Sequence, residues 1–338
     1  MSSKPIVVAE ISGNHNGSLD TALELLSEIS KSGCTHVKLQ TYTPDTITLP
    51  VNNDIFRISN SHELWGGETL YELYRRAHTP WDWHFPLYSR AAELGLTIFS
   101  TPFDSSAVEF LENLNTPLYK IASIEIVDLP LIRLVAETGK PLIISTGTAN
   151  VSEVAQAVEA ARGAGCEDLT LLVCTSSYPA LPGEANLSRM KVLREMFNVK
   201  VGLSDHTLGI GVSVAAVALG ASIIERHVTL SRAHGGVDSA FSLEPNELSQ
   251  LVTESLSALE AIGHPYAWRT DGEYESLRLR PSLFVVRDVK AGETVSPLNV
   301  RSVRPSGGLA PDDFSLIKNR TFNADFSMGS PVNWNMFT

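Results

Sequence analysis

The chain has 338 residues, of which 43% are hydrophobic and 19% are charged. This composition supports a sizeable core and excludes a disordered or fibrous protein, and the length allows one large domain or a large and a small one. The formal net charge of −12 argues against nucleic acid and anionic membranes as partners. No apolar run reaches 18 residues and no signal peptide is evident, so a cytoplasmic protein without membrane contact is predicted.

Three cysteines are present, Cys34, Cys166 and Cys174, and none of them belongs to a CxxC pair. An odd number without that spacing predicts neither a disulfide framework nor a zinc knuckle. Cys174 follows an apolar run, and the sequence places no evident general base beside it. We therefore expect a buried, inert thiol there.

Short apolar runs alternate with longer helical patterns from the N-terminus to about residue 262. The runs are continuously apolar and rich in Val, Ile and Leu, as in strands buried on both faces of a parallel sheet. Eight strands are predicted: Ile6 to Ile11, Thr35 to Leu39, Leu96 to Ser100, Leu118 to Ile121, Pro141 to Ser145, Leu169 to Val173, Val199 to Ser204 and Ser222 to His227. Eight strand-helix units predict an α/β fold, a closed (β/α)8 TIM barrel over residues 1–262. An open doubly wound sheet is the alternative, but no GxGxxG motif follows the first strand.

Two of the intervening helices have clear signals. Asn150 with Glu153 three residues later predicts an N-cap, and the helix after it has an apolar face. A second helix is predicted from about Asn246 to Ile262. Its expected buried face consists of Leu248, Leu251, Val252, Leu256 and Leu259.

Two segments depart from the repeat. An insertion from Thr41 to about Thr79 separates the second strand from its helix, and loops of this length often act as lids or binding loops. Residues 263–282 read as a charged linker. Residues 283–338 are rich in Pro, Gly and Asn between short apolar runs, which predicts a small β-rich domain that docks on the barrel or on a partner subunit because its own core is marginal.

Polar side chains stand at the end of every predicted barrel strand, where active sites of this fold lie. Lys38 and Lys120 are costly to bury on barrel strands unless they meet an anion. Together with hydroxyl groups from several strands, they would form a cradle for a phosphate and a carboxylate. The sequence therefore predicts an anionic, phosphorylated substrate.

Two histidines end neighbouring strands at equivalent positions. His206 follows the seventh strand and His227 closes the eighth. Two imidazoles completed by waters and a carboxylate suit a divalent transition ion such as Mn²⁺ or Zn²⁺. His206 and His227 are therefore the predicted metal ligands.

Several motifs resemble the sialic acid synthase family over essentially the whole chain. They are AEISGNHNG (residues 9–17), VKLQT (37–41), STPFD (100–104), YKIAS (119–123), LSDHT (203–207), IERH (224–227) and VDSAFSLEP (237–245). The C-terminal part, with RPSLFVV (280–286) and VRPSGGL (303–309), is similar to that family's antifreeze-like (SAF) domain. The runs HTPWDWH (78–84), CTSSYPA (174–180) and TLSRAHGGVDSAFSLEP (229–245) are most similar to the pseudaminic acid synthases within the family.

The resemblance implies a metal-assisted condensation of phosphoenolpyruvate with an acetamido sugar and water, with phosphate released by C–O cleavage. For the pseudaminic acid group the sugar is 2,4-diacetamido-2,4,6-trideoxy-L-altrose. The implied cofactor is a divalent ion on His206 and His227, most commonly Mn²⁺, with Mg²⁺ or Co²⁺ as alternatives.

The resemblance also assigns roles to residues. Lys38 is expected to hold the carboxylate of phosphoenolpyruvate. The expected phosphate ligands are Thr101, Lys120, Ser123, Ser145 and Ser176. Glu10 and Glu125 are the expected acid and base, because a carboxylate near a developing cation stabilises charge and can take a proton from water.

Matching family positions predict sugar-binding roles for Gln40, Tyr178, Asp238 and Arg304. Arg304 lies in the antifreeze-like domain, which in this family reaches into the active site of the other subunit, so the resemblance implies a domain-swapped homodimer. Phe241, close to Asp238, is expected to pack on the methyl group of the 6-deoxy sugar.

Three alternatives stay open. An N-acetylneuraminate or legionaminic acid synthase would use the same chemistry on another sugar. A Schiff-base aldolase would form its covalent adduct on Lys38 or Lys120. A non-enzymatic ice- or glycan-binding protein would use the C-terminal domain and leave the strand-end residues unexplained.

Overall fold

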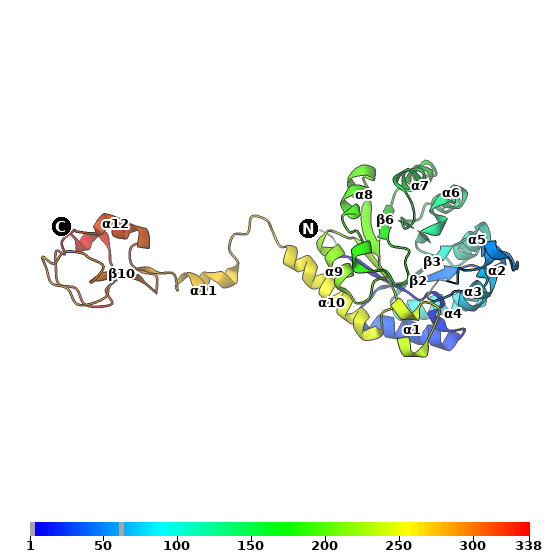
Figure 1. Ribbon diagram of the computed structural model, residues 1–338, viewed down its shortest axis with the longest axis horizontal. Coiled ribbons are helices and arrows are strands. Elements are labelled where there is room, and N and C mark those ends of the chain that lie inside the picture. Colours follow the sequence, from blue (N-terminus) through cyan, green and yellow to red (C-terminus); the bar gives the residue numbers. More distant parts are fainter. Residues whose placement is uncertain (1–3, 61–63) are drawn as a thin grey trace. The chain divides into compact units, whose positions relative to one another are not determined.

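The computed structural model describes residues 4–60 and 64–338, and its largest feature is a closed barrel of parallel strands (Figure 1). The strands are β1 (Ile6–Glu10), β2 (His36–Thr41), β3 (Thr97–Pro102), β4 (Tyr119–Ile121), β5 (Leu142–Ser145), β6 (Leu169–Cys174), β7 (Lys200–Ser204) and β8 (Ile223–His227). Each strand pairs with the next in sequence, and β8 pairs with β1. The predicted TIM barrel and its eight strands are confirmed, and the doubly wound alternative is wrong.

Side-chain alternation divides each strand between two environments. Residues that point outward join the large core beneath the helices, for example Val37, Leu39 and Ile224. Residues that point inward at the N-terminal end of the barrel form a second, smaller apolar cluster of Val8, Phe99, Ile143, Leu172 and Ile223. That cluster fills the barrel below the site described in the next section, as side-chain layers do in this fold.

A helix returns the chain after each strand. These helices are α1 (Leu19–Lys31), α4 (Trp81–Glu93), α5 (Ser105–Asn113), α6 (Leu129–Ala136), α7 (Val151–Gly163), α8 (Arg189–Phe197), α9 (Gly211–Ala218) and α10 (Pro245–Ile262). The predicted cap of α7 is confirmed, because Asn150 and Glu153 form a reciprocal capping box. On α10, Leu248 and Leu251 are buried, whereas the other three expected positions are only partly buried. No helix of the described chain is long and apolar enough to cross a bilayer.

The insertion after β2 contains two short helices before α4 begins. They are α2 (Pro44–Ile47) and α3 (Leu70–Ala77), each of which starts with a capping box. Leu73 of α3 is buried. Residues 61–63 of the predicted insertion lie outside the described residues.

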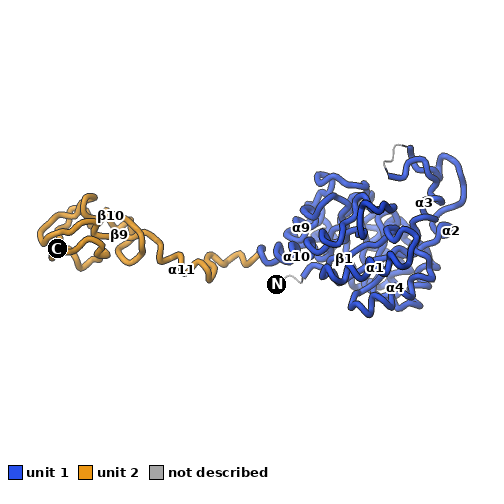
Figure 2. Tube along the Cα trace, turned by 90° about the horizontal axis from the view of Figure 1, so that it is seen from below, with its two compact units in different colours: residues 1–262 blue, residues 263–338 orange. Residues whose placement is uncertain are grey.

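The chain divides into two compact units, Met1–Ile262 and Gly263–Thr338 (Figure 2). The second unit contains α11 (Tyr274–Leu277), an antiparallel pair of β9 (Ser282–Val285) and β10 (Val300–Val303), and α12 (Phe314–Ile317). Isolated bridges extend its β-structure, including Val289 with Phe326 and Thr294 with Thr321. It has its own small apolar core, Leu283, Val285, Val289, Val295, Val300, Ile317, Phe322, Val332, Met336 and Phe337.

A buried histidine ties α4 to the barrel beneath the insertion. His84 is fully buried, and its Nε2 lies 2.8 Å from Thr41 Oγ1, which lies 2.6 Å from Ser100 Oγ. Its Nδ1 lies 3.2 Å from the carbonyl of Pro80. Burial lowers the pKa of His84 to about 4, so the ring stays neutral in the folded protein well below its ordinary pKa.

This pKa predicts a loss of stability in mild acid. Between pH 6.5 and 4 the unfolded chain binds a proton on His84 and the folded chain does not, so the free energy of unfolding decreases as the pH falls. The share of one such histidine is at most about 3 kcal/mol. We expect His84→Gln to be less stable than wild type at pH 7.5 and to lose less stability between pH 7.5 and 4.5, measured as urea midpoints by tryptophan fluorescence.

The matched control is His264→Gln, since His264 is exposed. That variant should follow the wild-type decrease. If His84→Gln lost stability as steeply as wild type between pH 7.5 and 4.5, the neutral state of buried His84 would not contribute to the pH dependence.

Candidate active site

Above the apolar cluster, the barrel has a second inward-facing layer that is polar. Each strand contributes one buried side chain to it, and these are Glu10, Lys38, Thr101, Lys120, Ser145, Cys174, Ser204 and Glu225. Each stands two residues after another inward-facing position of its strand, so the alternation of the strands alone directs them inward. Six members of the layer, all except Glu10 and Thr101, form the floor of a cavity of about 230 Å³ at the C-terminal end of the barrel.

Four charged groups of this floor interact directly. Lys38 Nζ lies 2.6 Å from Glu10 Oε2 and 3.8 Å from Glu225 Oε1. Lys120 Nζ lies 3.6 Å from the same Glu225 oxygen, and Ser204 Oγ donates a hydrogen bond to it at 3.1 Å. None of these side chains is exposed by more than a few per cent, so their charges are compensated inside the protein and not by water.

The two carboxyl groups of the floor have opposite pKa shifts. Burial raises the pKa of Glu10 to about 7, although Lys38 acts in the other direction. Burial also acts to raise the pKa of Glu225, but Lys120 and Lys38 outweigh it and hold that pKa below its ordinary value. Environments that separate two carboxyl pKa values produce one proton donor and one permanent anion. The floor can therefore hold a proton on Glu10 near neutral pH while Glu225 stays ionised.

The two lysines also differ. Burial acts to lower the pKa of Lys38, but Glu10 and Glu225 outweigh it, so the pKa is raised and the ammonium ion is favoured. For Lys120 burial prevails over Glu225, and its pKa is lowered. An added anion near Lys120 would raise that pKa and favour the ammonium form, as expected of a group that binds an anionic ligand.

Hydroxyl groups form a small cradle beside Lys120. Ser123 Oγ accepts a hydrogen bond from the backbone N–H of Gly147 at 3.1 Å. The hydroxyls of Ser145 and Ser176 are buried and have no hydrogen-bond partner within the described part of the chain. A Cβ on Gly147 would lie 2.5 Å from Ser176 Oγ and 2.7 Å from Ser123 Oγ, so only glycine leaves this space open. Unpaired buried hydroxyls around an open space suit an anion with several oxygens.

The two histidines stand side by side above the floor, with ring centroids 5.2 Å apart. His206 Nδ1 lies 2.9 Å from the carbonyl of Thr175, which requires the proton on Nδ1. His227 Nδ1 lies 3.8 Å from Asp238 Oδ2 and is a buried atom without a hydrogen bond in the described chain. Burial, and then the charge of His206, hold the pKa of His227 well below its usual range.

A neutral imidazole with an unpaired nitrogen fits a metal ligand. Within residues 4–60 and 64–338, no group of three or more His, Cys, Asp or Glu side chains is arranged to hold a metal ion.

Cys174 differs from the sequence expectation. The thiol is buried and the three cysteines are free, as predicted. However, its neighbours His206, Ser123 and Lys120 lower its pKa although burial alone would raise it. The expectation of a thiol without a base beside it is wrong, because β6 and β7 are neighbours and bring position 174 next to the residue that follows β7.

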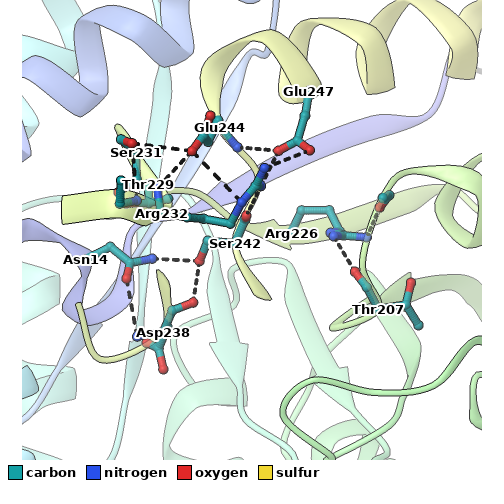
Figure 3. A network of polar contacts seen from close by, with 12 residues as sticks. Asn14, Thr207, Arg226, Thr229, Ser231, Arg232, Asp238, Ser242, Glu244 and Glu247 are labelled. Carbon is teal, nitrogen blue, oxygen red and sulfur yellow. Dashed lines mark hydrogen bonds and ion pairs between the residues drawn. The ribbon is translucent and has the colours of Figure 1, made fainter. Parts of the chain in front are cut away.

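The loop after β8 closes one side of the cavity and is attached to the loop after β1. Ser12 Oγ donates a 2.5 Å hydrogen bond to Asp238 Oδ2. Asn14 donates to Ser242 Oγ at 2.8 Å and accepts from the backbone N–H of Asp238 at 3.3 Å (Figure 3). Trp65 of the insertion donates its Nε1–H to the carbonyl of Val237 at 2.9 Å. Asp238 is thereby fixed beside the histidines.

The predicted site residues fall into two groups. Those that line the cavity are Lys38, Gln40, Lys120, Ser123, Glu125, Ser145, Tyr178, His206, His227 and Asp238. Burial raises the pKa of Glu125. An apolar part of the wall includes Tyr42, Ile47, Leu73, Phe103 and Ile124.

Other predicted residues do not line the cavity. Glu10 is fully buried against Lys38, and Ser176 lies beside Gly147. Thr101 is buried and accepts a 3.2 Å hydrogen bond from Lys38, so it supports that lysine. Phe241 is 1% exposed and does not line the cavity; its ring packs on His206 and His227 at centroid distances of 5.7 and 5.0 Å. The expected contact of Phe241 with a sugar methyl group is not what this geometry offers, because the ring is buried and does not line the cavity. Arg304 is exposed in the second unit.

Two site residues were given no role from the sequence. Glu225 pairs with both lysines, and Ser204 donates to Glu225. The available signal was the alternation within β8, which places Glu225 two residues before His227 and hence on the same inward face.

Comparison with known proteins identifies both parts of the chain. Residues 25–266 match the NeuB family, and residues 280–338 match the SAF domain. The chain is 43% identical over 329 residues to the pseudaminic acid synthase of Helicobacter pylori, covering 97% of this chain and 96% of that protein. It is 34% identical to the N,N'-diacetyllegionaminic acid synthase of Campylobacter jejuni, covering 91% and 92% of the two chains.

Among solved structures, the N-acetylneuraminic acid synthetase of Leptospira borgpetersenii aligns with a TM-score of 0.71 at 31% identity, covering 81% of this chain and 90% of that one. The family expected from the motifs is thus confirmed, as is the antifreeze-like domain. The chain belongs to the NeuB family, with a SAF domain after its barrel.

Proposed function

We propose that the chain condenses phosphoenolpyruvate with 2,4-diacetamido-2,4,6-trideoxy-L-altrose and water, giving pseudaminic acid and phosphate. One observation carries the proposal: two buried lysines, Lys38 and Lys120, line a barrel cavity together with the unpaired hydroxyl of Ser145. Its 43% identity over nearly the full length to a pseudaminic acid synthase supports the choice of sugar, against 34% to a legionaminic acid synthase.

Phosphoenolpyruvate would bind on the floor. Its phosphate would fill the cradle of Ser123, Ser145 and Ser176 beside Lys120. There it would give the unpaired hydroxyls charge-assisted hydrogen bonds. Its carboxylate would pair with Lys38, which Thr101 and Glu10 hold in place. The enol carbon would then face the open part of the cavity.

His206 and His227 would hold a divalent ion, Mn²⁺ by preference and Mg²⁺ or Co²⁺ as alternatives, with water and substrate oxygens as further ligands. The free Nδ1 of buried, neutral His227 supports this assignment. When bound, such an ion supplies Lewis acidity toward the aldehyde oxygen of the open-chain sugar.

The carboxyl groups would move the protons. As the enol carbon attacks the aldehyde carbon, the aldehyde oxygen must gain a proton, and Glu10 can hold one near neutral pH. The cationic centre that develops at C2 lies over ionised Glu225, which stabilises it. Glu125, at the cavity wall, would take the proton of the attacking water. The tetrahedral intermediate would then lose phosphate by C–O cleavage while the departing phosphate takes the proton of the C2 hydroxyl, with Lys120 neutralising the leaving group.

The sugar would lie between polar and apolar walls. Gln40, Tyr178 and Asp238 offer hydrogen bonds to its hydroxyl and acetamido groups. The apolar wall with Ile47 and Leu73 suits a sugar with two acetyl methyls and a methyl at C6, since a hydroxymethyl group there would be desolvated without a partner.

We further propose a cytoplasmic, domain-swapped homodimer, in which Arg304 of one copy completes the sugar site of the other. The support is the family resemblance together with the exposed position of Arg304 after β10. A Schiff-base aldolase is the second candidate function, because a lowered pKa makes Lys120 a better nucleophile.

The choice of sugar is tested by turnover. We expect phosphate release and a product of the mass of pseudaminic acid with the trideoxy altrose, and little turnover with N-acetylmannosamine or the legionaminic acid precursor. The assay incubates the full chain with phosphoenolpyruvate, Mn²⁺ and each sugar in turn. Turnover with N-acetylmannosamine alone would contradict the proposed substrate.

The metal is tested by chelation. Dialysis against EDTA should reduce activity to the level of His227→Ala, and Mn²⁺ should restore it in wild type. The matched control is His227→Ala itself, which EDTA should not reduce further. Full activity of the EDTA-treated wild type would exclude a required metal.

Lys120 separates the two candidate functions. In Lys120→Met we expect the KM for phosphoenolpyruvate to rise roughly 10²-fold, because a charge-assisted bond worth about 3 kcal/mol is lost. Lys200→Met, which removes an exposed ion pair with Asp168, should leave KM unchanged. Borohydride treatment of wild type with substrates should give no added mass, whereas an adduct on Lys120 would establish the aldolase.

A further inference from the structure

Behind the two histidines lies a buried ion pair that the proposed reaction does not use. Arg226 points away from the cavity, opposite to its neighbours Glu225 and His227 on β8. Its guanidinium is fully buried, and Nη1 lies 2.6 Å from Asp205 Oδ2. Asp205 directly precedes His206.

The Arg226–Asp205 pair is hydrogen-bonded to the backbone of residues that follow His206 in the sequence. Arg226 donates from Nη2 to the carbonyl of Thr207 at 2.7 Å and from Nη1 to the carbonyl of Gly209 at 2.9 Å (Figure 3). Asp205 Oδ1 accepts from the backbone N–H of Thr207 at 2.9 Å and from its hydroxyl at 2.8 Å. These contacts fix the residues on both sides of His206.

The same residues connect the loop to the rest of the barrel. Ser213 of α9 donates its hydroxyl to Asp205 Oδ2 at 2.5 Å. The backbone N–H of Asp205 donates to the carbonyl of Glu225 at 3.0 Å, which extends the pairing of β7 and β8 past the end of β7. Position and direction of the His206 backbone are therefore defined from the strand, from the helix and from Arg226.

Stability is a weak reason for such a pair. Desolvation of two charges offsets most of their attraction, and apolar residues of similar volume often serve a core equally well. An arginine here provides hydrogen bonds in fixed directions. Its planar guanidinium group bonds a carboxylate and two carbonyls at once, which a lysine or an apolar side chain cannot do. Side chains that do not touch the metal but orient its histidine ligands change metal affinity.

We propose that Asp205 and Arg226 are positioning residues that hold His206 at the distance from His227 needed for a shared ligand. The inference rests on the proposed function through the role of His206. The pair defines the position of the His206 backbone. The hydrogen bond from His206 Nδ1 to the Thr175 carbonyl defines the orientation of the ring.

The test uses Arg226→Lys and Ser213→Ala in the full chain. Arg226→Lys keeps the charge opposite Asp205 but cannot bond both carbonyls, and Ser213→Ala removes one bond to Asp205 from a helix outside the cavity. Mn²⁺ binding is measured from the electron paramagnetic resonance signal of the free ion, and kcat and the KM for phosphoenolpyruvate are measured in parallel. Val158→Ala is the matched control, because Val158 is buried on α7, away from this loop.

We expect the dissociation constant of Mn²⁺ to rise about 10- to 100-fold in Arg226→Lys and about threefold in Ser213→Ala. The KM for phosphoenolpyruvate should stay unchanged, because other strands form its seat. Val158→Ala should lower the melting temperature without changing Mn²⁺ affinity or kcat.

Unchanged Mn²⁺ affinity and kcat in a folded Arg226→Lys would overturn the positioning role, and if that variant does not fold, the same outcome in Ser213→Ala would overturn it. Failure of the proposed function gives a different result, because it concerns wild type. If wild type turns over without binding Mn²⁺, the metal is removed from the function and kcat of the variants decides the positioning role. If wild type binds Mn²⁺ without condensing any of the sugars, the binding measurement decides it.

Discussion

The site depends on the mutual compensation of four buried charges at one level of the barrel. Glu10, Lys38, Lys120 and Glu225 are at most 4% exposed, so an ionised member depends on an opposite charge beside it and not on water. The barrel makes the cluster possible because strands β1, β2, β4 and β8 each direct one side chain to the same height. Removal of any one charge leaves its partners uncompensated, which ties the fold of this layer to its function.

The buried charges do not cancel completely, and the imbalance favours binding of an anion. When Glu10 holds its proton, two amino groups face the single carboxylate of Glu225, and a bound anion would favour the ammonium form of both. This local imbalance exists within a chain whose net charge is −12. A small anion can reach it through the open end of the barrel, whereas a polyanion would meet the acidic exterior first. Overall charge and site charge therefore select for ligand size as well as for sign.

The sequence predicts those parts of the structure that depend on local periodicity. Continuous apolar runs identify all eight strands, and the Asn150 box identifies the start of α7, because both signals are contained in a few consecutive residues. The inward direction of Lys38, Lys120, His206 and His227 follows from the same alternation once a barrel is assumed.

Contacts between distant segments are harder to foresee. Cys174 and His206 influence each other only because β6 and β7 pair in one particular register. Phe241 lies in a loop whose course is set by Asn14 and Ser12, more than 220 positions away, so its place behind the histidines had no local signal. The inward direction of Glu225, by contrast, follows from the alternation within β8. Arg226 follows from that same pattern: between two inward residues a strand must point one side chain outward, and a charge there needs a built partner, which Asp205 supplies beside His206.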